Sequence, residues 1–276
     1  MAAVTFREML EARWVEADTM VCVGLDPELA KFPESLRSLP VHEALIGFFK
    51  PIIDATAEYA CAFKPQIAHF AALGAESALV ELIAYIRSAH PLVPVILDSK
   101  RGDIGSTAGF YAAEAFERFN AHAVTVNPYL GFDGVEPFLK YADRGVIILC
   151  RTSNPSAGDF QDLVVDGRPL YQHVAARVAS EWNDSGQCSL VVGATWPAQL
   201  REVRDIVGDS VPFLVPGVGA QGGKASDVVE NAATSDGFGL MINSSRGIIY
   251  ASSGDDFAAA AGIAARTLRD EIRAAR

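Results

Sequence analysis

Residues 93–104 read VPVILDSKRGDI, an apolar, β-branched run followed at once by a charged turn. The run predicts a buried parallel strand. Because residues two apart on a strand share a face, Asp98 and Lys100 should leave its carboxyl end together. Gly102 permits a tight turn that can return Asp103 to the same place. The stretch predicts an active site at a strand end, and its alternative is a solvated charged loop.

Apolar runs of strand length recur along the chain, and longer segments separate them. The runs are residues 19–24, 60–64, 93–97, 122–127, 146–150, 189–193, 212–215 and 237–242. The separating segments show helical periodicity, for example at residues 78–86 and 228–233. This alternation predicts a (β/α)8 TIM barrel, with residues 1–276 as one domain. A doubly wound open sheet is the alternative, disfavoured because no GxGxxG motif follows the first run.

Two segments fall outside the simple alternation. The longest insertion, about residues 153–170, follows the fifth run and is broken by Gly158 and Gly167. It predicts an ordered loop rather than a second domain. The Ala/Arg-rich residues 257–275 predict a final helix that closes the barrel.

Composition excludes several classes of function. The net charge of −11 argues against nonspecific nucleic-acid binding and against an anionic membrane surface. No apolar run reaches transmembrane length, and the N-terminus lacks the order of a signal peptide. The 4 cysteines are scattered without metal-ligand spacing, so we expect buried free thiols in a reducing cytoplasm and no metal.

Polar residues follow several of the predicted strands at their carboxyl ends. GLDP follows the first strand at residues 24–27, KPQ the second at 64–66, and RTSNPS the fifth at 151–156. In a barrel these ends converge on one mouth. The residues expected around one pocket are therefore Asp26, Lys64, Asp98, Lys100 and Asp103.

Glycine-rich turns follow the seventh and eighth strands. They read PGVGAQGG at residues 216–223 and NSSRG at residues 243–247. Glycines let backbone N–H groups approach a phosphate, and a helix N-terminus adds a favourable dipole. Arg246 can bind two phosphate oxygens through its planar fork. A single such turn is a common structural feature, but two at these strands predict a phosphate site.

The ordered motifs together resemble the orotidine 5′-monophosphate decarboxylase family, and most of all its longer bacterial branch. They are GLDP, FKPQ, DSKRGDI, TSNP, PGVGAQ and SSRG, and the resemblance runs from about residue 20 to residue 250. It implies loss of CO₂ from orotidine 5′-monophosphate to give uridine 5′-monophosphate, the last step of de novo pyrimidine synthesis. It also implies that no cofactor takes part.

The resemblance assigns a role to each candidate residue. Lys100 would donate a proton to C6 of the pyrimidine, and Asp98 would face the substrate carboxylate. Asp103 would reach the neighbouring subunit's site, which implies a homodimer. The remaining assignments are Lys64 in the charged network, Asp26, Lys64 and Thr107 on the ribose hydroxyls, Ser153 on the pyrimidine, and Gln221, Arg246 and amides near Gly219 and Gly247 on the phosphate.

The residues independently suit this chemistry. Decarboxylation leaves an electron pair on carbon, and Lys100 between two carboxylates should stay protonated and stabilise that charge. One rival is a related phosphosugar barrel that uses a divalent metal for an aldol reaction, but Lys100 would repel the metal. The other rival is a non-catalytic nucleotide-binding barrel, which would have no use for so costly a group of charges.

Overall fold

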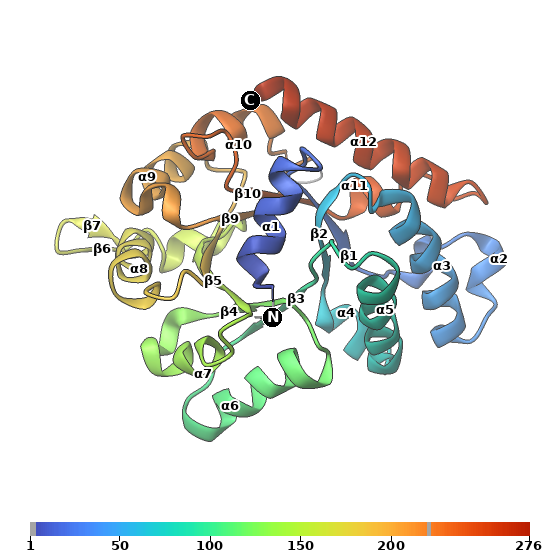
Figure 1. Ribbon diagram of the computed structural model, residues 1–276, viewed down its shortest axis with the longest axis horizontal. Helices are drawn as coiled ribbons and strands as arrows, with labels where there is room; N and C mark the ends of the chain where they lie inside the picture. The colour runs from blue at the N-terminus through green and yellow to red at the C-terminus, as the bar shows by residue number, and fades with distance from the viewer. Residues whose placement is uncertain (1–3, 220–221) are drawn as a thin grey trace.

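The computed structural model describes residues 4–219 and 222–276, and its main feature is a parallel sheet curved into a barrel (Figure 1). The strand order is β2-β1-β10-β9-β8-β5-β4-β3. Parallel bridges between Phe63 and Val95 and between Gln66 and Asp98 bring the two edge strands together. The strands are β1 (Val21–Leu25), β2 (Ala60–Pro65), β3 (Ile96–Arg101), β4 (Ala123–Val126), β5 (Gly145–Arg151), β8 (Cys188–Val192), β9 (Phe213–Pro216) and β10 (Leu240–Ser244).

Helices surround this barrel and follow the strands in sequence (Figure 1). The longest are α3 (Val41–Thr56), α5 (Glu76–Ala89), α9 (Pro197–Val207) and α12 (Phe257–Ala275). The others are α2 (Glu34–Arg37), α4 (Ile67–Ala71), α6 (Gly105–Ala113), α7 (Glu136–Leu139), α8 (Leu170–Arg177), α10 (Ala225–Ala232) and α11 (Arg246–Ile249). With helices outside and side chains inside, every residue of β1, β2, β4 and β8 is buried. This burial explains the continuous apolar runs.

The N-terminal helix α1 (Phe6–Val15) covers the amino end of the barrel, where Figure 1 shows it lying across the ring. Its Phe6, Leu10 and Trp14 are buried. The Trp14 indole Nε1 donates a hydrogen bond of 2.9 Å to the carbonyl of Leu240, the first residue of β10. The amino end is thus closed, and the carboxyl end is left as the open mouth.

All eight predicted strands form, with shifts at their ends. β3 begins at Ile96 and runs on to Arg101, so that Asp98 and Lys100 lie within the strand rather than after it. β10 begins at Leu240 because Gly237 and Gly239 have φ angles of +83° and +80°, which extended strands do not adopt. The predicted final helix is confirmed as α12, which packs against α3 and α10.

The insertion after β5 is ordered, as the sequence predicts. It holds a 3₁₀ turn at Pro155–Asp159 and a small antiparallel hairpin of β6 (Val164–Val165) and β7 (Arg168–Pro169). Among the helices of the described residues, none has both the length and the apolar character to cross a membrane.

Candidate active site

An ion triad of Lys64, Asp98 and Lys100, of which Lys64 and Asp98 are buried, lies where β2 and β3 end. Lys64 Nζ lies 2.9 Å from Asp98 Oδ2, and Lys100 Nζ lies 2.6 Å from Asp98 Oδ1. The side chains of Lys64 and Asp98 are 5% and 9% exposed, whereas that of Lys100 is 44% exposed. The Asp98 carboxylate therefore pairs with two ammonium groups, and of these two only the Lys100 ammonium belongs to an exposed side chain.

Thr125 of β4 fixes this triad from the neighbouring strand. Its Oγ1 donates a hydrogen bond of 2.8 Å to Asp98 Oδ1 and accepts the backbone N–H groups of Ser99 and Lys100, each at 2.9 Å. Lys100 has a φ of +47°, a left-handed conformation that a lysine rarely adopts. The simple alternation of side chains along β3 thus breaks at Lys100, and Thr125 holds the resulting turn in place.

The triad favours the charged form of each buried member. Burial alone would raise the pKa of Asp98, but the ammonium groups of Lys64 and Lys100 outweigh it and hold that pKa well below its usual range. Burial alone would lower the pKa of Lys64, but the carboxylates of Asp98 and Asp26 outweigh it and raise that pKa. The site therefore holds fixed charges before any ligand enters.

A cavity of about 180 Å³ adjoins the triad and reaches across the mouth to the loops after β9 and β10. Asp26, Lys64, Asp98, Asn243 and Arg246 are among its lining residues. The Oδ1 atoms of Asp26 and Asn243 are buried and make no hydrogen bond within the described residues. Because buried polar atoms are normally paired, these two oxygens point to a polar ligand.

Gly24 lets the two sides of this cavity approach. A Cβ built on Gly24 would lie 1.8 Å from Ser245 Oγ, so any side chain at position 24 would displace Ser245 in the loop after β10. Tyr250 ties the same two loops together, because its hydroxyl donates to the Asp26 carbonyl at 3.0 Å and accepts the Glu28 N–H at 2.6 Å. The loop with Asp26 is thereby held against the loop with Arg246.

The residues predicted to hold a phosphate lie in the segments that follow β9 and β10. Arg246 is exposed beside the cavity and makes no ion pair with another described residue. Gly247 lies in the first turn of α11, where backbone N–H groups lack intrahelical partners. The Gly219 N–H, however, donates to the Gly223 carbonyl at 2.9 Å, so a phosphate would have to replace that bond. Gln221 lies outside the described residues.

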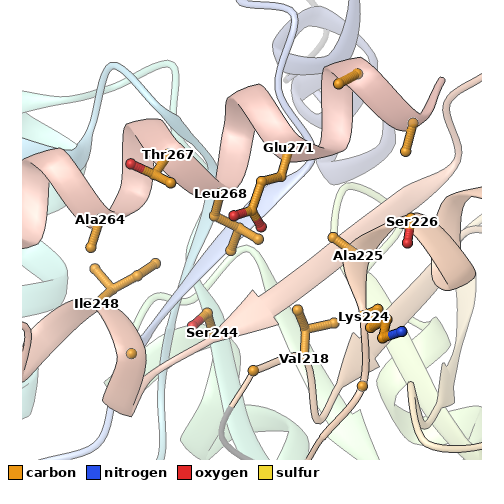
Figure 2. A pocket seen from close by; sticks show the side chains of 15 residues that line it. Val218, Lys224, Ala225, Ser226, Ser244, Ile248, Ala264, Thr267, Leu268 and Glu271 are labelled. Atoms are coloured by element: carbon orange, nitrogen blue, oxygen red, sulfur yellow. The ribbon is translucent and has the colours of Figure 1, made fainter.

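A larger cavity of about 770 Å³ lies behind these loops, against α12 (Figure 2). Leu268 and Glu271 of α12 face Val218 and Lys224 across it, and Gly219 and Gly247 form part of its wall. Of the described residues that line it, none belongs to the ion triad. The smaller cavity, which Lys64 and Asp98 line, is therefore the one that adjoins the triad, although the larger one has more space.

Three predicted residues make no hydrogen bond or ion pair with the triad within the described part of the chain. Asp103 accepts only the N–H of Ile104, at 2.8 Å, among the hydrogen bonds of the described residues. Thr107 is exposed on α6, and Ser153 is half-buried in the loop after β5. These positions lie at the mouth, but the described chain alone does not complete a site around them.

Sequence reasoning gave no separate role to Thr125, Asn243 or Tyr250, although it included Asn243 in a predicted phosphate-binding turn. Thr125 and Asn243 each carried a signal, because each is a polar residue at the carboxyl end of an otherwise apolar strand. Tyr250 carried none, since both of its hydrogen bonds are to residues more than 220 positions away.

The arrangement suits an anionic substrate that develops negative charge beside Lys100. Both oxygens of Asp98 are already bonded to ammonium groups, which opposes their use as metal ligands. Among the described residues, no three His, Cys, Asp or Glu side chains gather closely enough to hold a metal ion.

Comparison with known proteins agrees with this geometry. Residues 19–262 match the sequence model of the Orotidine 5′-phosphate decarboxylase / HUMPS family. The orotidine 5′-phosphate decarboxylase of Cellvibrio japonicus is 56% identical over 273 residues, which cover 99% of this chain and 100% of that protein. The same enzyme of Janthinobacterium sp. (strain Marseille) is 57% identical over 269 residues, which cover 98% of each chain.

Solved structures show the same fold. The OMP decarboxylase of Leishmania donovani is similar with a TM-score of 0.84 at 39% identity, covering 99% of this chain and 98% of that one. The UMP synthase of the same organism is similar with a TM-score of 0.87 at 41% identity, and there this chain spans only 57% of the longer chain. On the family match and relatives that are 56–57% identical along almost their whole length, the chain belongs to the Orotidine 5′-phosphate decarboxylase / HUMPS family.

Proposed function

We propose that this chain, working as a single barrel domain, converts orotidine 5′-monophosphate to uridine 5′-monophosphate and CO₂, the last step of de novo UMP synthesis. The observation that carries the proposal is the Lys64–Asp98–Lys100 triad, which lies beside a cavity with Arg246 on its other side. A fixed cation beside the reacting carbon and a separate anion-binding group are what this reaction requires.

The reaction breaks the bond between C6 and the carboxylate, and the electron pair stays on C6. We infer that the Lys100 ammonium stabilises this pair and then gives C6 a proton, after which Lys100 takes a proton from water. Asp98 would face the substrate carboxylate and hold Lys100 in position through their 2.6 Å contact. Because the triad is ordered before substrate enters, little reorganisation is needed during the reaction.

The rest of the nucleotide would be held around the mouth. Asp26, with its unpaired buried oxygen, suits a ribose hydroxyl. Arg246 suits the phosphate, whose binding energy can be used for positioning although it lies far from C6. The other proposed contacts are Lys64 and Thr107 on the ribose, Ser153 on the pyrimidine, and Gln221 with the amides near Gly219 and Gly247 on the phosphate.

We further propose a homodimer in which Asp103 completes the partner's site. Ile104 follows Asp103 in the chain and is 57% exposed, Phe110 on α6 is 76% exposed, and Tyr129 in the loop after the neighbouring strand β4 is 80% exposed. Large exposed apolar side chains on neighbouring segments support a protein interface. The 4 cysteines are buried free thiols, which supports a reducing cytoplasm as the place of action.

The direct test is to incubate the purified protein with orotidine 5′-monophosphate and follow the loss of absorbance, with and without EDTA. Turnover that survives exhaustive EDTA treatment and dialysis is the expected result. Activity that vanishes and returns only with Mg²⁺ would favour the metal-dependent aldolase. Nucleotide binding without turnover would favour the non-catalytic barrel.

A further inference from the structure

A buried arginine at the mouth joins the insertion after β5, which carries Ser153, to the loop after β8. Arg151 ends β5 with its side chain 2% exposed, and its Nη2 donates to Asp162 Oδ2 at 3.0 Å. Its Nε lies 2.9 Å from Asp162 Oδ1, and its Cζ lies 4.7 Å from the centre of the Trp196 ring. We call Arg151, Asp162 and Trp196 the latch. It fastens the insertion after β5 to the loop after β8.

A second pair of contacts strengthens the same closure. The Thr152 N–H donates to Gln161 Oε1 at 2.8 Å, and Gln161 Nε2 donates to Thr152 Oγ1 at 2.9 Å. Residues 161–162 thus fold back onto residues 151–152. Residues 153–160 are thereby enclosed in a short closed loop whose shape depends on the latch.

Ser153 is the first residue of that closed loop and is tightly placed. A Cβ built on Gly193 would lie 2.8 Å from the backbone nitrogen of Ser153, so the two loops touch because position 193 has no side chain. The Thr195 hydroxyl donates to the Ser153 carbonyl at 3.4 Å. Ser153 is therefore fixed between the insertion and the loop after β8, the two segments that the latch joins.

We propose that Arg151 and Asp162 are positioning residues, which place Ser153 for its contact with the pyrimidine by latching the insertion across the mouth. This inference rests on the proposed decarboxylation and adds a residue pair that does not touch the substrate. Asp162 lies on the insertion with its side chain 45% exposed, and its removal leaves the buried Arg151 guanidinium without a carboxylate partner, so Tm is measured beside activity. Loss of the latch should loosen the loop while the barrel stays folded.

The test compares Asp162→Ala with a matched control, Asp159→Ala. Asp159 lies on the same insertion, is exposed, and makes no ion pair with another described residue. We expect Asp162→Ala to lower kcat/KM about 10–100-fold, the scale of a misplaced contact, and Asp159→Ala to change it less than about 2-fold. Equal effects of the two substitutions would overturn the proposal.

A double variant separates positioning from a general structural role. If the latch acts through Ser153, Asp162→Ala should cause less than about a 2-fold further loss in a Ser153→Ala background. Losses that multiply in the double variant would show that Asp162 acts elsewhere and would overturn the proposal.

Limited proteolysis gives a readout that does not depend on activity. Phe160 is 64% exposed inside the closed loop, and chymotrypsin cleaves after aromatic residues. Cleavage there should be at least about 10-fold faster in Asp162→Ala than in Asp159→Ala, because the loop opens more often. Equal cleavage rates would contradict the latch itself. If the wild-type protein does not turn over the nucleotide, the proposed function is refuted. Slower cleavage of the wild type than of Asp162→Ala would then still show that the latch exists, but the latch would have no role in this reaction.

Discussion

The two ends of the barrel bury ionisable groups in opposite ways. At the carboxyl end, the triad of Lys64, Asp98 and Lys100 keeps its charges, because each buried group faces an opposite charge. At the amino end, His122 lies just before β4, and its Nδ1 accepts the Val95 N–H at 2.9 Å. Burial, with the guanidinium groups of Arg87 and Arg144, lowers the pKa of His122 to about 3.

The difference shows that burial alone does not decide whether a group is charged. At the triad, opposite charges outweigh burial and keep the buried groups ionised. At His122, burial is the larger cause, and the like charges of Arg87 and Arg144 act in the same direction and keep the ring neutral. In a barrel, the carboxyl end holds the chemistry and the amino end contributes stability. Changes at the carboxyl end should therefore alter rate, and changes at the amino end should alter folding.

The largest effect is expected from Lys100→Ala. It removes both the cation that stabilises the developing charge and the proton donor, so kcat should fall at least about 10⁴-fold. Because the Lys100 side chain is 44% exposed, the variant should stay folded, with an unchanged circular dichroism spectrum and nearly unchanged Tm. A variant that is folded and retains a tenth of the wild-type kcat would remove Lys100 from the chemistry.

Arg246→Ala should have a smaller effect, and of a different kind. Losing one partner of a charge-assisted pair costs about 2–4 kcal/mol of transition-state stabilisation, or about 30–1,000-fold in kcat/KM, mostly through KM. Steady-state kinetics with the nucleotide measure both constants. An unchanged KM would mean that the phosphate binds elsewhere.

Subunit mixing tests whether one chain supplies all the residues of its own active site or takes Asp103 from the partner subunit. In the proposed homodimer, the Lys100→Ala and Asp103→Asn proteins should each be nearly inactive. After subunit exchange, about half the dimers are mixed, and each has one site with an intact Lys100 and the partner's intact Asp103. About a quarter of wild-type activity should return. If exchange is verified and no activity returns, Asp103 does not act across an interface.

The smallest effect is expected at the amino end, as a pH dependence of stability. The folded pKa of His122, about 3, lies below its ordinary value of 6.5, so the unfolded chain binds a proton that the native chain does not bind. The free energy of unfolding is therefore highest above pH 6.5, where the ring is neutral in both states, and falls as the pH drops from 6.5 toward 3. Between pH 7 and 4.5 the loss should be about 1–3 kcal/mol.

Urea unfolding of the wild type and of His122→Asn at both pH values measures this loss. The asparagine can still accept the Val95 N–H but does not titrate in this range, so its stability should depend less on pH. The same pH dependence in both proteins would show that His122 is not the group responsible.

The sequence predicted where the strands lie better than it predicted the local backbone and the long-range contacts of the charged residues at their ends. Eight apolar runs predicted the barrel because the apolar residues of its strands are buried on both faces of the sheet. Strand ends predicted that Lys64, Asp98 and Lys100 would meet. The positive φ of Lys100 was not predictable, because Thr125 on another strand holds it. The latch was not predictable either, since it joins Arg151 to residues 11 and 45 positions further along the chain.

The central claim is that Lys100 performs the chemistry while Arg246 only binds the phosphate at the other side of the mouth. The most direct test measures kcat/KM of wild type, Lys100→Ala and Arg246→Ala with orotidine 5′-monophosphate and with orotidine, which lacks the phosphate. Lys100→Ala should slow both substrates by similar factors. Arg246→Ala should slow the nucleotide about 30–1,000-fold and leave orotidine unchanged within about 2-fold. An equal loss with both substrates for Arg246→Ala would contradict this division of roles.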